Sequence, residues 1–194
     1  EFADGICLEA PESDTDFYES AIAFGRFQEM LREFPAETLH ETIPLFHNTT
    51  NRYRIFRKAL QDDLAGRAAG VPDDIRFALD REQEAGTLCS LLDSGELPLR
   101  VTHNDTKLNN VLFELDLDPL MPGSSLYDYG DSIRFGAATA AEDEKDLSKM
   151  GINLHLFQVY TAGYLAACKS LTPKELELLP LGAKIITLEL AVRF

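Results

Sequence analysis

A short polar segment near the middle of the chain says most about the fold. Residues 103–110 (HNDTKLNN) lie between two brief apolar runs, Leu97–Val101 and Val111–Phe113. Runs of this length fit strands better than helices. Elsewhere in the sequence, apolar residues recur near helical spacing. We therefore expect a mainly α-helical fold with one small β-hairpin at its centre.

Helical patterns occur on both sides of this segment. We expect helices over about 16–33, 52–63, 72–95, 154–170, 173–179 and 182–194. Pro35 ends the first pattern, and Pro72 followed by acidic residues is typical of a helix start. Residues 38–51 and the segment that begins with 127–131 are expected to be irregular. Because the sequence has no repeat and no linker, we expect residues 1–194 to form one domain.

The composition argues against several kinds of partner and compartment. The chain has 33 acidic and 18 basic side chains, a net charge of −15. Phosphate contacts need clustered Lys and Arg, so we expect no nucleic acid and no membrane as partner. No apolar run is long enough to span a bilayer. Cys7, Cys89 and Cys168 are too widely spaced for a zinc site, and the first residues do not form a signal peptide, which favours a cytoplasmic location.

The polar segment contains the groups that a phosphoryl-transfer site needs. His103 and Asp105 form a His-x-Asp pair, Asn110 follows five residues after that Asp, and Asp116 comes soon afterwards. One carboxylate can accept the proton of an attacking hydroxyl group. The amide oxygen and the later carboxylate can hold Mg²⁺ on the phosphates of a nucleotide. The His-x-Asp pair alone is weak evidence, but the full combination is more specific.

The sequence around these residues resembles a known kinase superfamily. The segments that carry the resemblance are VTHNDTKLNNVLF at 101–113, DLD at 116–118, MPG at 121–123 and YDYGDSIRFG at 127–136. Shorter matches are FGRF at 24–27, LHETIP at 39–44, FHNT at 46–49 and LEL at 188–190. Together they resemble the aminoglycoside phosphotransferase-like kinases, and within them the N-acetylhexosamine 1-kinase branch. The resemblance implies the C-terminal lobe of a protein-kinase-like fold, with a catalytic loop at 103–110 and a metal segment at 116–118.

The resemblance also implies the chemistry. The activity would be ATP-dependent phosphorylation of a small-molecule hydroxyl group, namely the anomeric hydroxyl of an N-acetylhexosamine. Asp105 would be the catalytic carboxylate that faces this hydroxyl. Asn110 and Asp116 would hold Mg²⁺ through their side-chain oxygens, and Asp118 would either bind the metal or support its ligands. ATP, Mg²⁺ and a sugar are thus the implied cofactors and substrate, whereas the sequence does not indicate an oligomeric state.

Other residues of the matched segments would support the site. Lys107 would balance the charge of the transferred phosphate, or else lie in solvent. His103 and Asp128 would be structural and brace the catalytic loop. Four residues are candidate substrate contacts, although an Arg on a helix and a His in a loop usually have no specific partner. They are Arg134, Arg193, His40 and His47.

The sequence departs from the family pattern in two places. These kinases have a β-rich N-terminal lobe that supplies a phosphate-binding Lys, but nothing before Asp16 predicts such a lobe, and the first Lys is Lys58. We therefore expect an isolated C-terminal lobe with little activity of its own. Only five residues separate Asn110 from Asp116. Because the family has a longer hairpin here, we expect residues to be missing at Phe113–Glu114.

Two alternatives to the main hypothesis stay open, and a third is disfavoured. Phosphorylation of an aminoglycoside or of choline would suit the acidic composition, since these substrates are cations. A kinase C-terminal lobe kept as a non-catalytic binding module is a second alternative. A hydrolase is disfavoured, because the four His are not clustered and the chain has no G-x-S-x-G motif.

Overall fold

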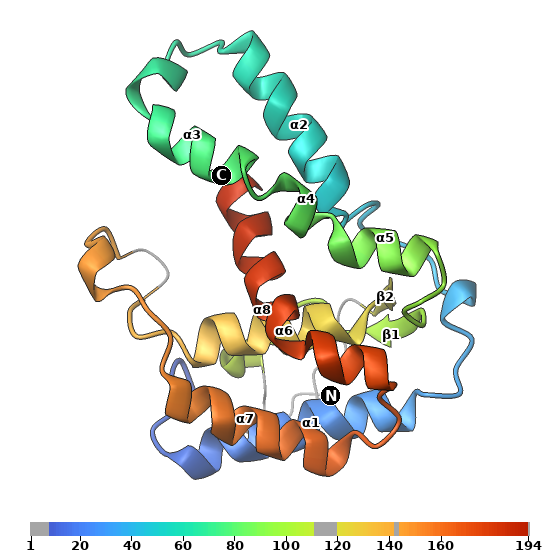
Figure 1. The fold of residues 1–194 in the computed structure, drawn as a ribbon. Coiled ribbons are helices and arrows are strands. Elements are labelled where there is room, and N and C mark those ends of the chain that lie inside the picture. The colour runs from blue at the N-terminus through green and yellow to red at the C-terminus, as the bar shows by residue number, and fades with distance from the viewer. Residues whose placement is uncertain (1–7, 111–119, 142–143, 194) are drawn as a thin grey trace.

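The computed structural model describes residues 8–110, 120–141 and 144–193, and it is mainly α-helical with a small antiparallel sheet (Figure 1). The longer helices are α1 (Asp14–Met30), α2 (Thr49–Asp62), α3 (Pro72–Leu79), α6 (Ser125–Gly136), α7 (Leu154–Ala167) and α8 (Pro173–Arg193). The shorter ones are α4 (Glu82–Ala85) and α5 (Thr87–Asp93), with 3₁₀ turns η1 (Ala36–Thr38), η2 (Ala68–Gly70), η3 (Leu108–Asn110) and η4 (Leu147–Lys149). The expected fold class is confirmed at this level. None of the described helices has the length and apolar character needed to cross a membrane.

The sheet consists of two short strands that precede and follow the polar segment. Strand β1 (Arg100–Thr102) pairs with β2 (Met121–Gly123), and Arg100 lies opposite Gly123. The partner strand expected at Val111–Phe113, and the expected break at Phe113–Glu114, lie outside the described residues. Met121–Gly123 was not predicted as a strand, because Pro and Gly are poor strand residues.

The body of the molecule consists of two pairs of packed helices. Helix α1 runs beside α7, and α6 packs against α8 (Figure 1). Helix α1 begins at a capping box, in which Ser13 and Asp16 bind each other's backbone N–H groups. At the crossing of α6 and α8, a Cβ atom added to Gly130 would lie 2.5 Å from the backbone of Gly182. Only glycine therefore allows these two backbones to approach so closely.

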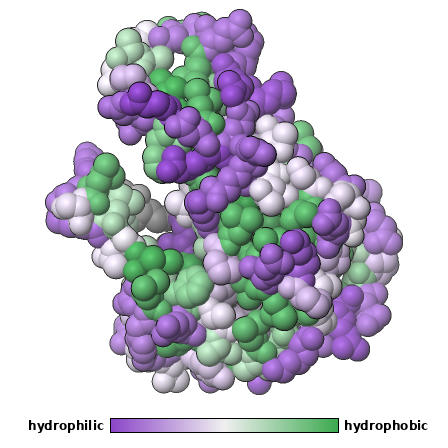
Figure 2. Space-filling view, viewed as in Figure 1, coloured by the Kyte–Doolittle hydropathy of each residue, from purple (hydrophilic) through white to green (hydrophobic). Residues whose placement is uncertain are grey.

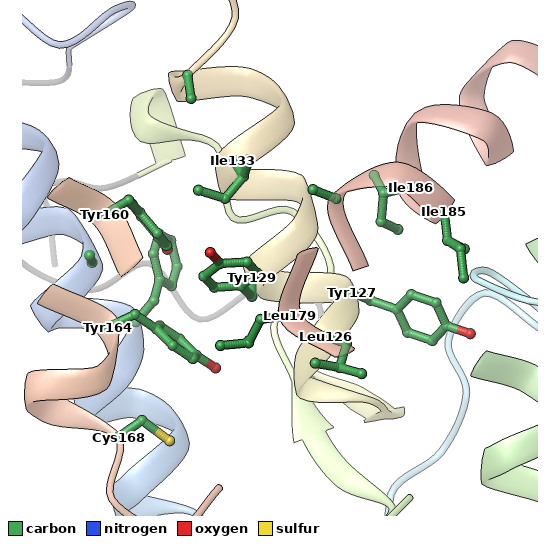
Figure 3. Packing of buried hydrophobic residues seen from close by; sticks show 14 of the residues in the cluster. Leu126, Tyr127, Tyr129, Ile133, Tyr160, Tyr164, Cys168, Leu179, Ile185 and Ile186 are labelled. Atoms are coloured by element: carbon green, nitrogen blue, oxygen red, sulfur yellow. The ribbon is translucent and has the colours of Figure 1, made fainter. Parts of the chain in front are cut away.

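The core between these helices is rich in tyrosine. Tyr129 points from α6 towards Tyr160 and Tyr164 of α7, with ring centroids 5.8 and 5.4 Å away (Figure 3). Tyr127 leaves α6 in the opposite direction, towards the loop that precedes α2 (Figure 3). Helix α6 is thus covered on both sides, which explains why nearly all of its residues are buried.

Helices α2, α3 and α4 project from this body around the last turns of α8 (Figure 1). They share a small buried cluster with α8, formed by Tyr53, Ala78, Ala85, Leu188 and Val192. Figure 2 shows apolar side chains gathered on the inner side of this projecting unit, beneath a largely hydrophilic outer surface. An apolar groove of about 260 Å³ lies there, between α2, α3 and α8.

Two of the expected helix boundaries are wrong. The single helix expected over 72–95 is divided into α3, α4 and α5, because the chain turns at Asp80–Arg81 and again at Gly86. The two helices expected over 173–179 and 182–194 form the single helix α8, which contains Pro180. Pro180 is exposed, so water can reach the carbonyl that its missing N–H leaves without a helical partner.

The segment opened by Tyr127–Asp131 was expected to be irregular, which is also wrong. It lies inside α6, whose N-cap is Ser124 with a side-chain oxygen that accepts the N–H of Leu126. Gly130, Asp128 and Asp131 are weak helix formers in isolation. The helix forms here because packing on both sides outweighs local preference.

Candidate active site

The loop after β1 begins with a fully packed histidine. His103 is buried, and its ring makes edge-to-face contacts with Phe24 and Phe27 of α1 at centroid distances of 5.6 and 6.0 Å. A ring held in this way cannot swing towards a substrate. The geometry agrees with a bracing role rather than with direct chemistry.

Asp128 of α6 holds the backbone of the same turn. Its two carboxylate oxygens accept the N–H groups of His103 and Asn104, each at 2.8 Å, and one also accepts the side-chain amide of Gln28 at 3.1 Å. Asn104 has a φ of 70°, in the left-handed region that Asn tolerates better than most residues. Burial raises the pKa of Asp128, and the two backbone N–H groups oppose this rise by stabilising the charged form.

Asp105 follows this turn and remains accessible. Its side chain is 48% exposed, and its backbone carbonyl accepts the side-chain N–H of Asn110 at 3.1 Å. The ammonium group of Lys107 lies 4.0 Å from a carboxylate oxygen of Asp105 and 5.7 Å from the centre of the Phe135 ring. Loop 103–110 therefore brings together the predicted carboxylate, the predicted lysine and the predicted amide.

The predicted metal ligands are only partly described. Asp116 and Asp118 lie outside the described residues. Among the described residues, no three His, Cys, Asp or Glu side chains are grouped as a metal site. Because the amide nitrogen of Asn110 is bound to the Asp105 carbonyl, its hard amide oxygen is the atom suited to coordinate Mg²⁺.

A pocket of about 180 Å³ opens beside the loop at Asn104. His47 lies in its wall and stacks on Tyr127 of α6 with ring centroids 4.9 Å apart. The Nδ1 atom of His47 is 3.3 Å from a carboxylate oxygen of Glu189, which is buried. Its Nε2 atom is also buried and has no hydrogen-bond partner within the described part of the chain.

The other candidate substrate residues lie in different places. The guanidinium group of Arg193 is 5.7 Å from the centre of the Phe46 ring, and Phe46 lines the pocket beside His47. Arg134 instead forms an ion pair with Asp131 at 2.8 Å and is largely buried. His40 is exposed, and it does not belong to the lining of the pocket.

Sequence reasoning gave no role to several residues that shape this site, among them Asp131, Ser132, Thr106 and Gln28. Asp131 and Ser132 lie three and four residues after Asp128, which places all three on one face of a helix. This spacing is visible in the sequence, but it indicates a shared face only if the segment is known to be helical. Gln28 is 100 positions away from Asp128, so only the tertiary structure reveals the contact.

No model of a known protein family matches this chain.

Proposed function

We propose that this chain is the catalytic lobe of a phosphotransferase with a protein-kinase-like fold. Within that class, we propose an ATP-dependent kinase that phosphorylates the anomeric hydroxyl of an N-acetylhexosamine. The observation that carries the proposal is the loop itself: Asp105 keeps a half-exposed carboxylate, while hydrogen bonds fix the backbone around it. The resemblance of the sequence to sugar kinases supplies the reaction and the substrate.

Asp105 would accept the proton of the sugar hydroxyl as the phosphoryl group is transferred. Phosphoryl transfer through a loose transition state depends mainly on positioning and on charge stabilisation, so a strong base is not needed. Lys107 would offset negative charge near Asp105, from its position 4.0 Å away. Asn110, together with Asp116 and Asp118, would hold Mg²⁺, which supplies charge neutralisation on the nucleotide phosphates.

The pocket beside Asn104 supports a sugar as the acceptor. Its lining includes the exposed side chains of Glu41 and Asp93, whose carboxylates can accept hydrogen bonds from sugar hydroxyl groups. Phe46 and Leu99 add an apolar wall that fits the methyl of an acetamido group. Arg193 beside Phe46 would reach the rim of the same pocket.

The central test is Asp105→Asn in the full-length natural polypeptide that contains this sequence. The substitution keeps the shape of the side chain but removes its charge. We expect turnover to fall by about 10²- to 10⁴-fold, the usual contribution of a positioned acid or base. Thermal unfolding should be unchanged, because the Asp105 side chain is half exposed. Near-normal turnover in the folded variant would reject the assignment.

A substrate screen that measures release of ADP then separates the alternatives. The acceptors are N-acetylglucosamine, N-acetylgalactosamine, choline and an aminoglycoside, each tested with ATP and Mg²⁺. Turnover with a hexosamine supports the proposal, whereas turnover with only the cationic acceptors indicates the choline or aminoglycoside alternative. Sugar binding without any turnover indicates a non-catalytic binding module.

A further inference from the structure

Thr106, the residue after Asp105, is held at each of its polar groups by α6. Its N–H donates to a carboxylate oxygen of Asp131 at 3.0 Å, and its hydroxyl donates to the backbone carbonyl of Asp128 at 2.5 Å. Its own carbonyl accepts the hydroxyl of Ser132 at 2.8 Å. Thr106 is buried, so these bonds are shielded from water.

These three partners occupy one face of α6. Asp128, Asp131 and Ser132 are spaced at i, i+3 and i+4, which places their side chains next to each other on a helix. Asp128 also binds the N–H groups of His103 and Asn104, on the other side of Asp105. The same helix face therefore holds the chain immediately before and immediately after Asp105.

Asp131 is itself held in place. Both Nε and Nη2 of Arg134 donate to its second oxygen, at 3.2 and 2.8 Å. Burial raises the pKa of Asp131, and the nearby Asp105 adds to this rise, while Arg134 lowers it by stabilising the charged form. Arg134 thus helps to keep Asp131 charged and in place, where it accepts the N–H of Thr106.

We propose that Asp131 and Ser132 are positioning residues, which set the direction of the Asp105 side chain by fixing Thr106 against α6. This inference rests on the proposed function of Asp105 as the catalytic carboxylate. Helix α6 is suited to the task, because its close crossing with α8 at Gly130 and Gly182 leaves it little freedom to shift. Both chain neighbours of Asp105 are thus anchored on a rigid support.

The kinetic test compares Ser132→Ala, Thr106→Val and Thr106→Ser in the full-length polypeptide. We expect Ser132→Ala and Thr106→Val to lower kcat by about 10- to 100-fold, since small misplacements of a reacting group have effects of this size. The KM for the sugar should change little, and Thr106→Ser should restore most of the kcat lost in Thr106→Val. A rise in KM at unchanged kcat, or equal loss in both Thr106 variants, would overturn the proposal.

The control is Ser90→Ala, which removes a hydroxyl that also donates to a backbone carbonyl but lies exposed on α5. It should retain the kcat of the wild type. If Asp105→Asn is inactive while Ser132→Ala is fully active, only the positioning role fails. If the wild type phosphorylates no acceptor, the proposed function fails instead.

A second measurement does not depend on activity. Hydrogen exchange of the Thr106 amide should be slow in the wild type and much faster in Asp131→Asn, because a neutral amide oxygen is a weaker acceptor than a carboxylate. Exchange within α1 should not change. Equal exchange at Thr106 in the two proteins would show that Asp131 does not fix the loop.

Discussion

At the scale of single residues, a buried ion pair joins the sheet to the start of α8. The side chain of Glu175 has no exposed surface and accepts Nε and Nη2 of Arg100 at 2.5 and 2.8 Å. The hydroxyl of Ser125 at the start of α6 donates to the same carboxylate at 2.8 Å. Glu175 therefore connects α8 with β1, which leads into loop 103–110, and with α6, which binds that loop.

The pKa of Glu175 determines how this pair depends on pH. Burial alone would raise it, but the hydrogen bonds from Arg100 and from the backbone of Thr172 outweigh burial and place it below its ordinary value of 4.5. A carboxyl with a depressed pKa in the folded state stabilises the protein at neutral pH. That contribution is lost as the pH falls below 4.5 and through the lower pKa of the folded state.

We predict that Arg100→Met lowers the free energy of unfolding by about 3–5 kcal/mol at neutral pH, the usual cost of leaving a buried charge unpaired. The penalty should shrink in acid, where Glu175 can become neutral. The double variant Arg100→Met/Glu175→Met should recover most of the stability at neutral pH. Urea unfolding at several pH values gives the free energy of unfolding of the wild type, the single variant and the double variant. A penalty that is independent of pH would contradict the assignment to Glu175.

A matched control is Arg57→Met, which breaks the ion pair with Glu82 on the surface. Exposed pairs contribute little, because water screens the charges and the long side chains lose entropy. This variant should unfold like the wild type at each pH.

The polar residues of loop 103–110 could be identified in the sequence, but the residues that support them could not. Asp105, Lys107 and Asn110 could be chosen because they are close in sequence and belong to a spaced motif. Glu175 looks like an ordinary acid in the first turn of a helix, and its partner Arg100 is 75 positions away. A contact of that kind depends on tertiary packing, which no local pattern contains.

At the scale of elements, α6 shows where local preference fails as a guide. Its glycines and its short polar side chains argue against a helix, and the segment was predicted to be irregular. The same residues make it indispensable in the fold, since Gly130 allows contact with α8 while Asp128, Asp131 and Ser132 bind the loop. By contrast, α1 and α7 were both predicted within a few residues of their ends.

We predict that Gly130→Ala destabilises the protein by about 1–3 kcal/mol or more, as expected when a side chain is forced into a packed contact. The added methyl would meet the backbone of Gly182, which cannot move aside as a flexible side chain could. The free energy of unfolding in urea measures the effect. The control is Gly70→Ala, where an added Cβ has no neighbour within 4 Å and should be nearly neutral. Equal stability of the two variants would show that α6 and α8 can separate at little cost.

At the scale of the whole molecule, the projecting unit is less firmly built than the body. Among the described residues, its buried cluster has five members, whereas the cluster that joins α1, α6, α7 and α8 with Leu88 and Leu97 has 17. The hydroxyl of Tyr53 donates to the carbonyl of Ala78 at 3.0 Å and ties α2 to α3. Regions with few buried contacts open at lower free energy than the rest of a protein.

We predict that the free energy of opening, measured by exchange of backbone amides with solvent deuterium, is lower in α2 and α3 than in α6. Tyr53→Phe should speed exchange in α2 and α3 and leave α6 unchanged, since it removes only the bond to Ala78. Native-state hydrogen exchange, resolved by residue, measures both effects. Uniform acceleration throughout the chain would show that the two parts open together.

The tyrosine core between α6 and α7 has an optical consequence. The chain has six Tyr and no Trp, so tyrosine is the source of its intrinsic fluorescence. Tyr129, Tyr160 and Tyr164 lie close enough to pass excitation between their rings, and burial raises the pKa of Tyr129 to about 12. Three of the six tyrosines thus lie at the seam between these two helices, and their share of the emitted light reports on that seam without an added dye.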